Sequence, residues 1–233
     1  MALVASERTP CSFAALDRQS RRLRNRLIDL GLRAGDRLAL VLPDGPEMAA
    51  AFLTLGASLA LAPLNPAYRA EELEFYLSDL SAAAVVVPAG DGEAARLAAR
   101  RRCLPILELH VPAGAAAGEF DLIQVEGSML SRRSDFAEPS AEDVALLLHT
   151  SGTTARPKLV PLSHQNLCAS ARNIARTLAL RPSDRCLCVM PLFHIYGLIG
   201  ALLSSMAAGA SVACTSGFRS EEHTSELQSH LNL

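Results

Sequence analysis

The chain has 233 residues, of which 50% are hydrophobic and 20% are charged, and its formal net charge is -2. This composition excludes an intrinsically disordered chain and is typical of a soluble protein with a packed core. The near balance of 22 basic and 24 acidic side chains argues against nucleic acid as the main partner.

The first half of the chain predicts helices that alternate with short buried strands. Apolar residues recur at helical spacing after residue 12 until Gly31 ends the helix, and Pro46 suits the first turn of the next one. The signal weakens between residues 112 and 139, which predicts loops and a junction between subdomains. Strands are expected at 36–42, 82–88 and 103–109, and a strand followed by a turn at 59–66. Helices are expected at 12–32, 46–59, 70–80 and 91–101.

The alternation of strands and helices restarts after residue 139. Strands and helices that alternate at these lengths predict an α/β fold with mainly parallel sheets flanked by helices. We therefore expect a first α/β subdomain at 1–139 and the start of a second at 140–218. In this second part, strands are expected at 143–150, 158–163, 185–192 and 210–216, and helices at 164–180 and 195–209.

Membrane, secretion and metal signals are missing from the sequence. No apolar run reaches the roughly 18 residues that a bilayer crossing needs, and MALVASERTP lacks the pattern of a secretory signal. The 6 cysteines fit no zinc or redox spacing. Cys186 and Cys188 share a face of a predicted strand, where buried structural thiols are expected rather than a metal pair. Reduced cysteines favour a cytoplasmic protein.

One polar stretch interrupts the apolar pattern: HTSGTTARPKLVPLSH, residues 149–164. Its loop follows a predicted strand, and α/β folds bind ligands at the carboxyl ends of strands. Several residues here suit a phosphate group. Hydroxyls can donate hydrogen bonds, Gly152 allows backbone N–H groups to converge on an anion, and Lys158 is the chain's only lysine. The predicted phosphate-binding residues are Thr150, Ser151, Gly152, Thr153, Thr154 and Lys158.

Other interpretations of this stretch remain. Lys158 can be an ordinary surface lysine, and His149 is expected to be structural. The pattern is not a Walker A loop, because it lacks the Gly-Lys-Ser/Thr ending, and no Gly-x-Gly-x-x-Gly occurs in the chain. Ser163 and His164 are not expected to form a nucleophile–base pair, because Ser163 is well placed as the N-cap of the helix that follows.

The stretch resembles the phosphate-binding signature of the adenylate-forming superfamily, which includes acyl-CoA synthetases. Residues 150–154 and Pro157-Lys158 match that signature, whereas Ala155 and Leu159 stand where the family has glycine. PLFHIYGL, residues 191–198, resembles the family's acyl-pocket motif. The resemblance can be followed from about residue 3 to residue 218, and the motif sequences are most similar to those of the oxalate–CoA ligase-like branch.

The resemblance implies an ATP-dependent acid–thiol ligase that uses ATP, Mg²⁺ and CoA. A carboxylic acid would be activated as acyl-AMP, with Lys158 at the β- and γ-phosphates, and then transferred to CoA. His194 would face the carboxylate or gate the acyl tunnel, although a histidine packed at a strand end is an alternative. The substrate pocket implied by the resemblance contains Phe193, His194, Tyr196 and Gly197.

The family's later segments, which hold adenine, ribose, Mg²⁺ and a catalytic lysine, are not in the chain. We therefore expect an incomplete N-terminal domain that is inactive by itself. Residues 219–230 correspond to the translation of a common sequencing adapter, so residues 219–233 are expected to be a non-native tail. The alternatives are a non-catalytic nucleotide-binding module and a different phosphate-dependent enzyme that shares only the loop.

Overall fold

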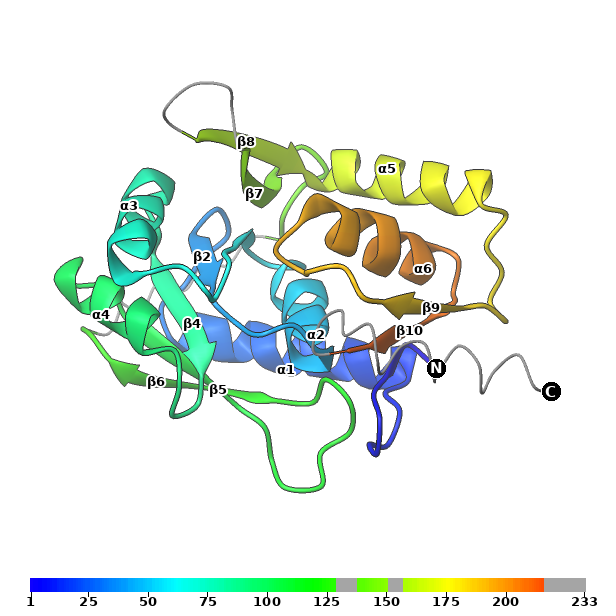
Figure 1. The fold of residues 1–233 in the computed structure, drawn as a ribbon, viewed down its shortest axis with the longest axis horizontal. Coiled ribbons are helices and arrows are strands. Elements are labelled where there is room, and N and C mark those ends of the chain that lie inside the picture. The colour runs from blue at the N-terminus through cyan, green and yellow to red at the C-terminus, as the bar shows by residue number, and fades with distance from the viewer. Residues whose placement is uncertain (129–137, 151–156, 216–233) are drawn as a thin grey trace.

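The computed structural model describes residues 1–128, 138–150 and 157–215, and the predicted tail at 219–233 lies outside these residues. Strands and helices alternate along most of the chain (Figure 1). The strands are β1 (Leu3–Val4), β2 (Arg37–Leu40), β3 (Ala60–Pro63), β4 (Ala84–Pro88), β5 (Ile106–His110), β6 (Asp121–Glu126), β7 (Val144–Thr150), β8 (Lys158–Ser163), β9 (Arg185–Cys188) and β10 (Ser211–Cys214). The helices are α1 (Phe13–Asp29), α2 (Pro46–Leu55), α3 (Ala70–Leu80), α4 (Glu93–Arg101), α5 (His164–Thr177), the π-helix η1 (Tyr196–Leu203) and α6 (Ser204–Ala207).

The described strands form two sheets. The larger has seven strands in the order β6-β5-β4-β2-β3-β7-β8, and the smaller has the order β1-β10-β9. Six of the eight strand pairs in the described residues are parallel, and only β5–β6 and β7–β8 are antiparallel. The prediction of an α/β fold with mainly parallel sheets is therefore confirmed.

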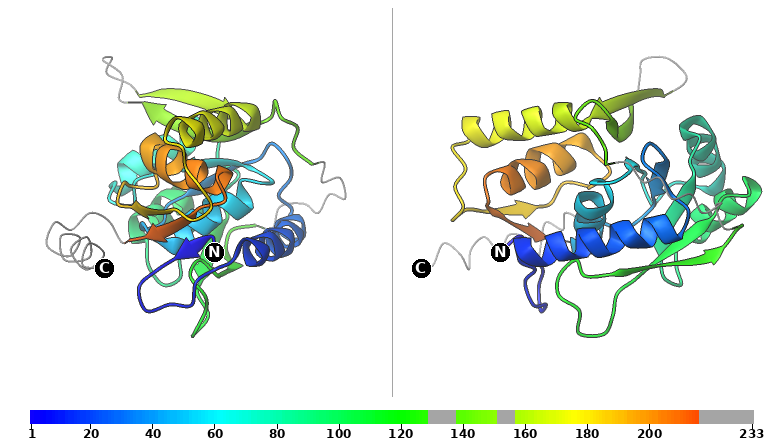
Figure 2. Two further views of the ribbon diagram at one scale, coloured as in Figure 1. Left: turned by 90° about the vertical axis from the view of Figure 1, so that its right-hand side faces the viewer. Right: turned by 180° about the vertical axis from the view of Figure 1, so that it is seen from behind.

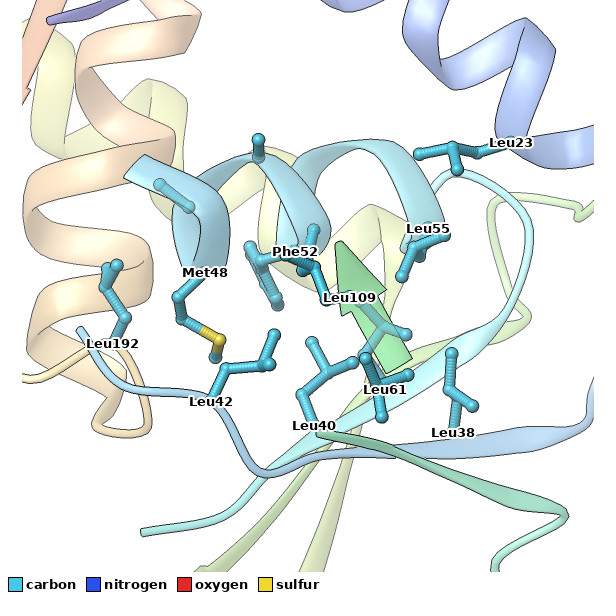
Figure 3. Packing of buried hydrophobic residues seen from close by; sticks show 14 of the residues in the cluster. Leu23, Leu38, Leu40, Leu42, Met48, Phe52, Leu55, Leu61, Leu109 and Leu192 are labelled. Atoms are coloured by element: carbon cyan, nitrogen blue, oxygen red, sulfur yellow. The ribbon is translucent and has the colours of Figure 1, made fainter. Parts of the chain in front are cut away.

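Both faces of the larger sheet are covered at its central strands, because successive residues of a strand point to opposite faces and enter two different apolar clusters. In β2, Leu38 and Leu40 belong to one apolar cluster, whereas Ala39 belongs to the other. The central strands β3, β4 and β7 divide their side chains between the two clusters in the same way. Helices α1 and α2 supply the apolar side chains opposite the first face (Figure 3), and α3 and α4 those opposite the second.

The remaining helices form a separate layer with the smaller sheet. Helix α5 packs along η1 and α6, which in turn pack on β9 and β10. Figures 1 and 2 agree that α5 and α6 lie side by side, at the opposite side of the molecule from α1. None of the helices in the described segments combines the length and the apolar character needed to cross a bilayer.

Several elements differ from their expected form. Strand β6 lies in the region where the sequence gives only a weak secondary-structure signal. Its apolar residues Ile123 and Val125 are each 42% exposed, so the spacing of apolar residues does not identify the buried face of this strand. Strands β7 and β8 complete the larger sheet, while β1 joins the smaller one, so the two sheets do not divide at residue 140. The helix expected at 195–209 begins as the π-helix η1 and continues as α6.

A core substitution tests the burial of the central strands. Leu61→Ala in β3 should lower the free energy of unfolding by about 2–5 kcal/mol, because Leu61 is fully buried and its removal leaves a cavity. Urea unfolding followed by circular dichroism measures the change. The control, Leu97→Ala on α4, removes a side chain that is 38% exposed and should cost clearly less. Equal losses in the two variants would contradict the assigned burial.

Candidate functional site

The site lies where β3 and β7, which are adjacent and parallel, reach their carboxyl ends. Parallel strands that end together bring their following loops to the same edge of the sheet, where α/β folds bind ligands. The loop after β3 carries Asn65 and Tyr68, and the chain after β7 begins the polar stretch. The geometry therefore brings together residues separated by more than eighty positions in the sequence.

A cavity of about 320 Å³ opens at this edge. Polar or aromatic side chains reach its wall from four parts of the chain: Asn65 and Tyr68 after β3, Tyr76 on α3, His149 and Thr150 on β7, and Phe193 and His194 after β9. A larger cavity of about 430 Å³ lies between α2, α5 and α6, but none of the predicted site residues lines it. The smaller cavity is therefore the candidate site.

The β7–β8 hairpin places Thr150 directly opposite Lys158. The Thr150 hydroxyl donates a long hydrogen bond of 3.5 Å to the Lys158 carbonyl, and the Lys158 side chain is exposed. The predicted phosphate-binding residues Ser151, Gly152, Thr153 and Thr154 lie outside the described residues. The structure thus places the two ends of the polar loop, with the only lysine at one of them.

His149, which precedes this loop, turns its side chain toward α3. Its Nε2 lies 2.9 Å from Oδ2 of Asp79, and its ring packs edge-on against Tyr76 at 4.6 Å. Burial, followed by the neighbouring Tyr68, raises the pKa of Tyr76 to about 12, so the phenol remains protonated at neutral pH. A structural role for His149 is thus compatible with its packing, but the packing also connects it to the cavity wall.

The turn at residues 191–198 carries the predicted acyl-pocket residues. The His194 amide donates to the Pro191 carbonyl at 3.1 Å, and the rings of Phe193 and His194 lie 5.2 Å apart. A side chain at Gly197 would overlap the Pro191 carbonyl, so the turn requires glycine there. The π-helix η1 begins at Tyr196, and such irregular turns are frequent at functional sites.

Asp44, which follows β2, holds the 191–198 turn against the larger sheet. Its Oδ1 accepts a hydrogen bond of 2.7 Å from the Leu192 amide. The Leu192 side chain is buried in the same cluster as Met48 and Leu42 (Figure 3). Burial raises the pKa of Asp44 above its usual value, and the bond from Leu192 opposes that rise. The turn is therefore fixed by one backbone hydrogen bond and one apolar anchor.

The structure brings some of the predicted site residues together and separates others. Thr150, Phe193 and His194 line one cavity. Tyr196 is 71% exposed and, like Gly197, is not among the lining residues, although Gly197 shapes the turn beneath them.

Sequence reasoning missed several residues of the site, because they are common residue types without a motif of their own. These residues are Asp44, Asn65, Tyr68, Tyr76 and Asp79. The one available signal was the Asn-Pro pair after β3, which marks a turn at the sheet edge.

The cysteines add no reactive thiol to the site, and the described residues offer no metal-binding cluster. All six cysteines are free, and burial raises the pKa of Cys188 to about 11 and that of Cys214 to about 12. Thiols with such pKa values are poor nucleophiles and metal ligands at neutral pH. Within residues 1–128, 138–150 and 157–215, no three His, Cys, Asp or Glu side chains come close enough to hold a metal ion.

Comparison with known proteins identifies a family that matches this chain. The model of the family described as AMP-binding enzyme matches residues 1–230, a range that includes most of the predicted tail. The oxalate–CoA ligase of Saccharomyces cerevisiae is 40% identical over 205 residues, which cover 78% of this chain and 37% of that protein. The oxalate–CoA ligase of Arabidopsis thaliana is 37% identical over 229 residues, covering 91% of this chain and 41% of that protein.

A solved structure matches the fold over nearly the whole chain. The crystal structure of apo MatB from Rhodopseudomonas palustris superposes with a TM-score of 0.77 at 25% identity, and the match covers 96% of this chain but 43% of MatB. The chain therefore spans about two fifths of the length of these relatives.

A glycine substitution tests the 191–198 turn. Gly197→Ala should lower the free energy of unfolding by about 1–3 kcal/mol, because the added methyl group meets backbone that cannot move away freely. Gly200→Ala in the same π-helix is the control, since a side chain there meets no atom within 4 Å. Chemical unfolding of both variants provides the measurement, and a Gly197 variant as stable as the Gly200 variant would show that the close contact is absent.

A second prediction concerns the pH dependence that Asp44 confers. Its pKa is raised in the folded protein, so its contribution to stability is greatest at low pH and is lost as pH rises above the ordinary value of 3.8. Asp44→Asn keeps an oxygen acceptor for the Leu192 amide without a charge. The thermal unfolding midpoint of this variant should match that of the parent below about pH 3 and exceed it increasingly toward pH 7.

The control, Asp44→Ala, removes the acceptor and should be less stable than the parent at neutral pH. An Asn variant that loses as much stability as the Ala variant at pH 7 would contradict this assignment.

Proposed function

Because the chain belongs to the AMP-binding enzyme family, we propose that it is part of an ATP-dependent ligase that activates a carboxylic acid as acyl-AMP and transfers it to CoA. The observation that carries the proposal is the single cavity lined by both Thr150, at the end of the polar loop, and His194, from the 191–198 turn. A phosphate-binding loop and an acid-binding turn must meet in this way, since the reaction joins a carboxylate to the α-phosphate of ATP.

The proposed reaction has two steps. In the first, a carboxylate oxygen attacks the α-phosphorus of ATP, and the bond to the β-phosphate oxygen breaks to release pyrophosphate. In the second, the sulfur of CoA, having lost its proton, attacks the acyl carbon and AMP leaves with the bonding electron pair. Negative charge grows on the pyrophosphate in the first step, so positive charge and hydrogen-bond donors placed there lower the barrier.

Lys158 is the residue proposed to meet that charge. Its ammonium group is exposed on β8, opposite Thr150, at the edge where the cavity opens. A compact ammonium on a flexible stem suits contact with the β- and γ-phosphates. Thr150, Ser151, Thr153 and Thr154 are proposed to add hydroxyl donors, and Gly152 backbone donors.

Phe193 and His194 are proposed to form the acid side of the site. His194 can donate a hydrogen bond to the carboxylate, while Phe193 beside it offers an apolar surface. Tyr196 is proposed to contact the acid from outside the cavity, and Gly197 to shape the turn. The two oxalate–CoA ligases among the relatives support a small acid such as oxalate as the substrate.

Two further properties are proposed on the same basis. Mg²⁺ would neutralise phosphate charge when bound with ATP, but the described residues offer no cluster of ligands for it, so none is assigned here. A cytoplasmic location is also proposed, and the six free cysteines support it, since reduced thiols are typical of that compartment.

Replacing the lysine tests the phosphate side. In the protein encoded by the longest genomic open reading frame that contains residues 1–218, Lys158→Ala should slow acid-dependent ATP–pyrophosphate exchange about a hundredfold, as expected when one transition-state donor is removed. Circular dichroism should be unchanged, because the side chain is exposed. Arg21→Ala on α1 is the matched control for loss of an exposed cation, since the Arg21 side chain is 79% exposed. Equal exchange rates in the two variants would count against the phosphate role.

A further inference from the structure

His149 is buried at the start of the site, in an arrangement that packing alone does not explain. Its side chain is only 7% exposed, and its Nε2 pairs with Asp79, seventy residues earlier in the chain. The partner carboxylate on α3 is 41% exposed. A phenylalanine would fill the same space against Tyr76 without removing a polar ring from water, so the imidazole is unfavourable for packing alone.

The second nitrogen of His149 strengthens this point. Nδ1 is buried and has no hydrogen-bond partner among the described residues. If Nε2 carries the proton that it donates to Asp79, Nδ1 is an unused acceptor, and buried polar groups without partners are rare outside functional positions. The ring therefore satisfies only one of its two nitrogens within the described structure.

Helix α3 provides a fixed platform for this contact. Leu73, Leu77 and Leu80 bury one side of the helix against the larger sheet. Tyr76 presents its ring to His149 and stacks on Tyr68 at 5.1 Å with an interplanar angle of 18°. Asp79 and Tyr76 thus hold His149 from two directions, one by a polar contact and the other by a ring contact.

His149 lies one residue pair away from Lys158 in the β7–β8 hairpin, so its contact with α3 would affect the position of Lys158. In the β7–β8 hairpin, His149 pairs with Leu159, and the next pair joins Thr150 to Lys158. A displacement of His149 is therefore passed to Lys158 across one ladder step. The 191–198 turn is held by a different contact, the hydrogen bond from the Leu192 amide to Asp44.

We propose that His149 is a positioning residue for the nucleotide side of the site: its contacts with Asp79 and Tyr76 hold the β7–β8 hairpin against α3 and so place Lys158. This inference rests on the proposed function. It predicts a selective effect, in which loss of the contact weakens the use of ATP and leaves the use of the acid unchanged.

The test compares variants of the protein encoded by the longest genomic open reading frame that contains residues 1–218. His149→Phe keeps the ring contact with Tyr76 but removes the bond to Asp79, and should raise KM for ATP about tenfold, equivalent to about 1.4 kcal/mol, with KM for the acid unchanged. His149→Gln, whose amide can still donate to Asp79, should recover most of the loss. Asp79→Ala, altered at a partly exposed side chain, should reproduce the Phe variant even if that variant folds poorly.

A matched control exists at the same edge of the sheet. His110 Nε2 lies 2.7 Å from Oε2 of Glu108 on β5, but His110 does not line the cavity. His110→Phe should leave both KM values unchanged. If His149→Phe and Asp79→Ala also leave KM for ATP unchanged, or if they raise both KM values together with a loss of thermal stability, the positioning role is overturned.

Failure of the proposed function would be recognised separately. In that case the parent protein itself would show no exchange with any carboxylate tested, oxalate included. Calorimetric titration with ATP then tests the positioning role directly. A Kd for ATP about tenfold weaker in His149→Phe than in the parent supports it, and an equal Kd or no binding by the parent overturns it.

Discussion

Burial of both faces of the central strands of the larger sheet is the constraint on which the rest of the structure depends. Leu38 and Leu40 face one helical layer while Ala39 faces the other, and β3, β4 and β7 repeat the alternation. Because no face of the central strands is free for chemistry, polar side chains are confined to the ends of strands. The carboxyl ends of β3 and β7 provide such a place, and the cavity with Thr150 and His194 lies there.

This constraint also explains which parts of the molecule could be predicted from the sequence. The alternation of helices with short apolar strands predicts the parallel sheet, because each element shows its periodicity locally. Strand order is a different matter. That β7 adds to β3, and β1 to β10, depends on contacts between distant segments. Strand β6 was not predicted, because Ile123 and Val125 are exposed apolar residues. A helix was expected at η1, but its π-helical form was not, because a π-helix has nearly the composition of an α-helix.

The residues of the candidate site also differ in whether the sequence alone could identify them. The polar loop with the only lysine stands out locally, since hydroxyls, glycine and a cation interrupt an apolar sequence. Asp44 and Asp79 do not, because an aspartate acquires its role only when folding brings the Leu192 amide or His149 to it. For His149 the expected structural role and the proposed positioning role share the same contacts, and what favours the second is a buried Nδ1 with no hydrogen-bond partner in the part of the chain that the structure describes.

The two sides of the site are attached to the sheet by unlike contacts. On one side, a carboxylate and an apolar anchor hold the 191–198 turn directly on the end of β2 and on α2. On the other, the antiparallel β7–β8 hairpin contacts α3 through the polar and ring contacts of His149, and Leu147 and Leu159 pack in the same apolar cluster as the leucines of α3. The turn is thus held from β2 and α2, whereas the side chains of the hairpin are held from α3. Under the proposed function, the acid and the phosphates are therefore held by separate sets of contacts, and His149 belongs to the set on the phosphate side.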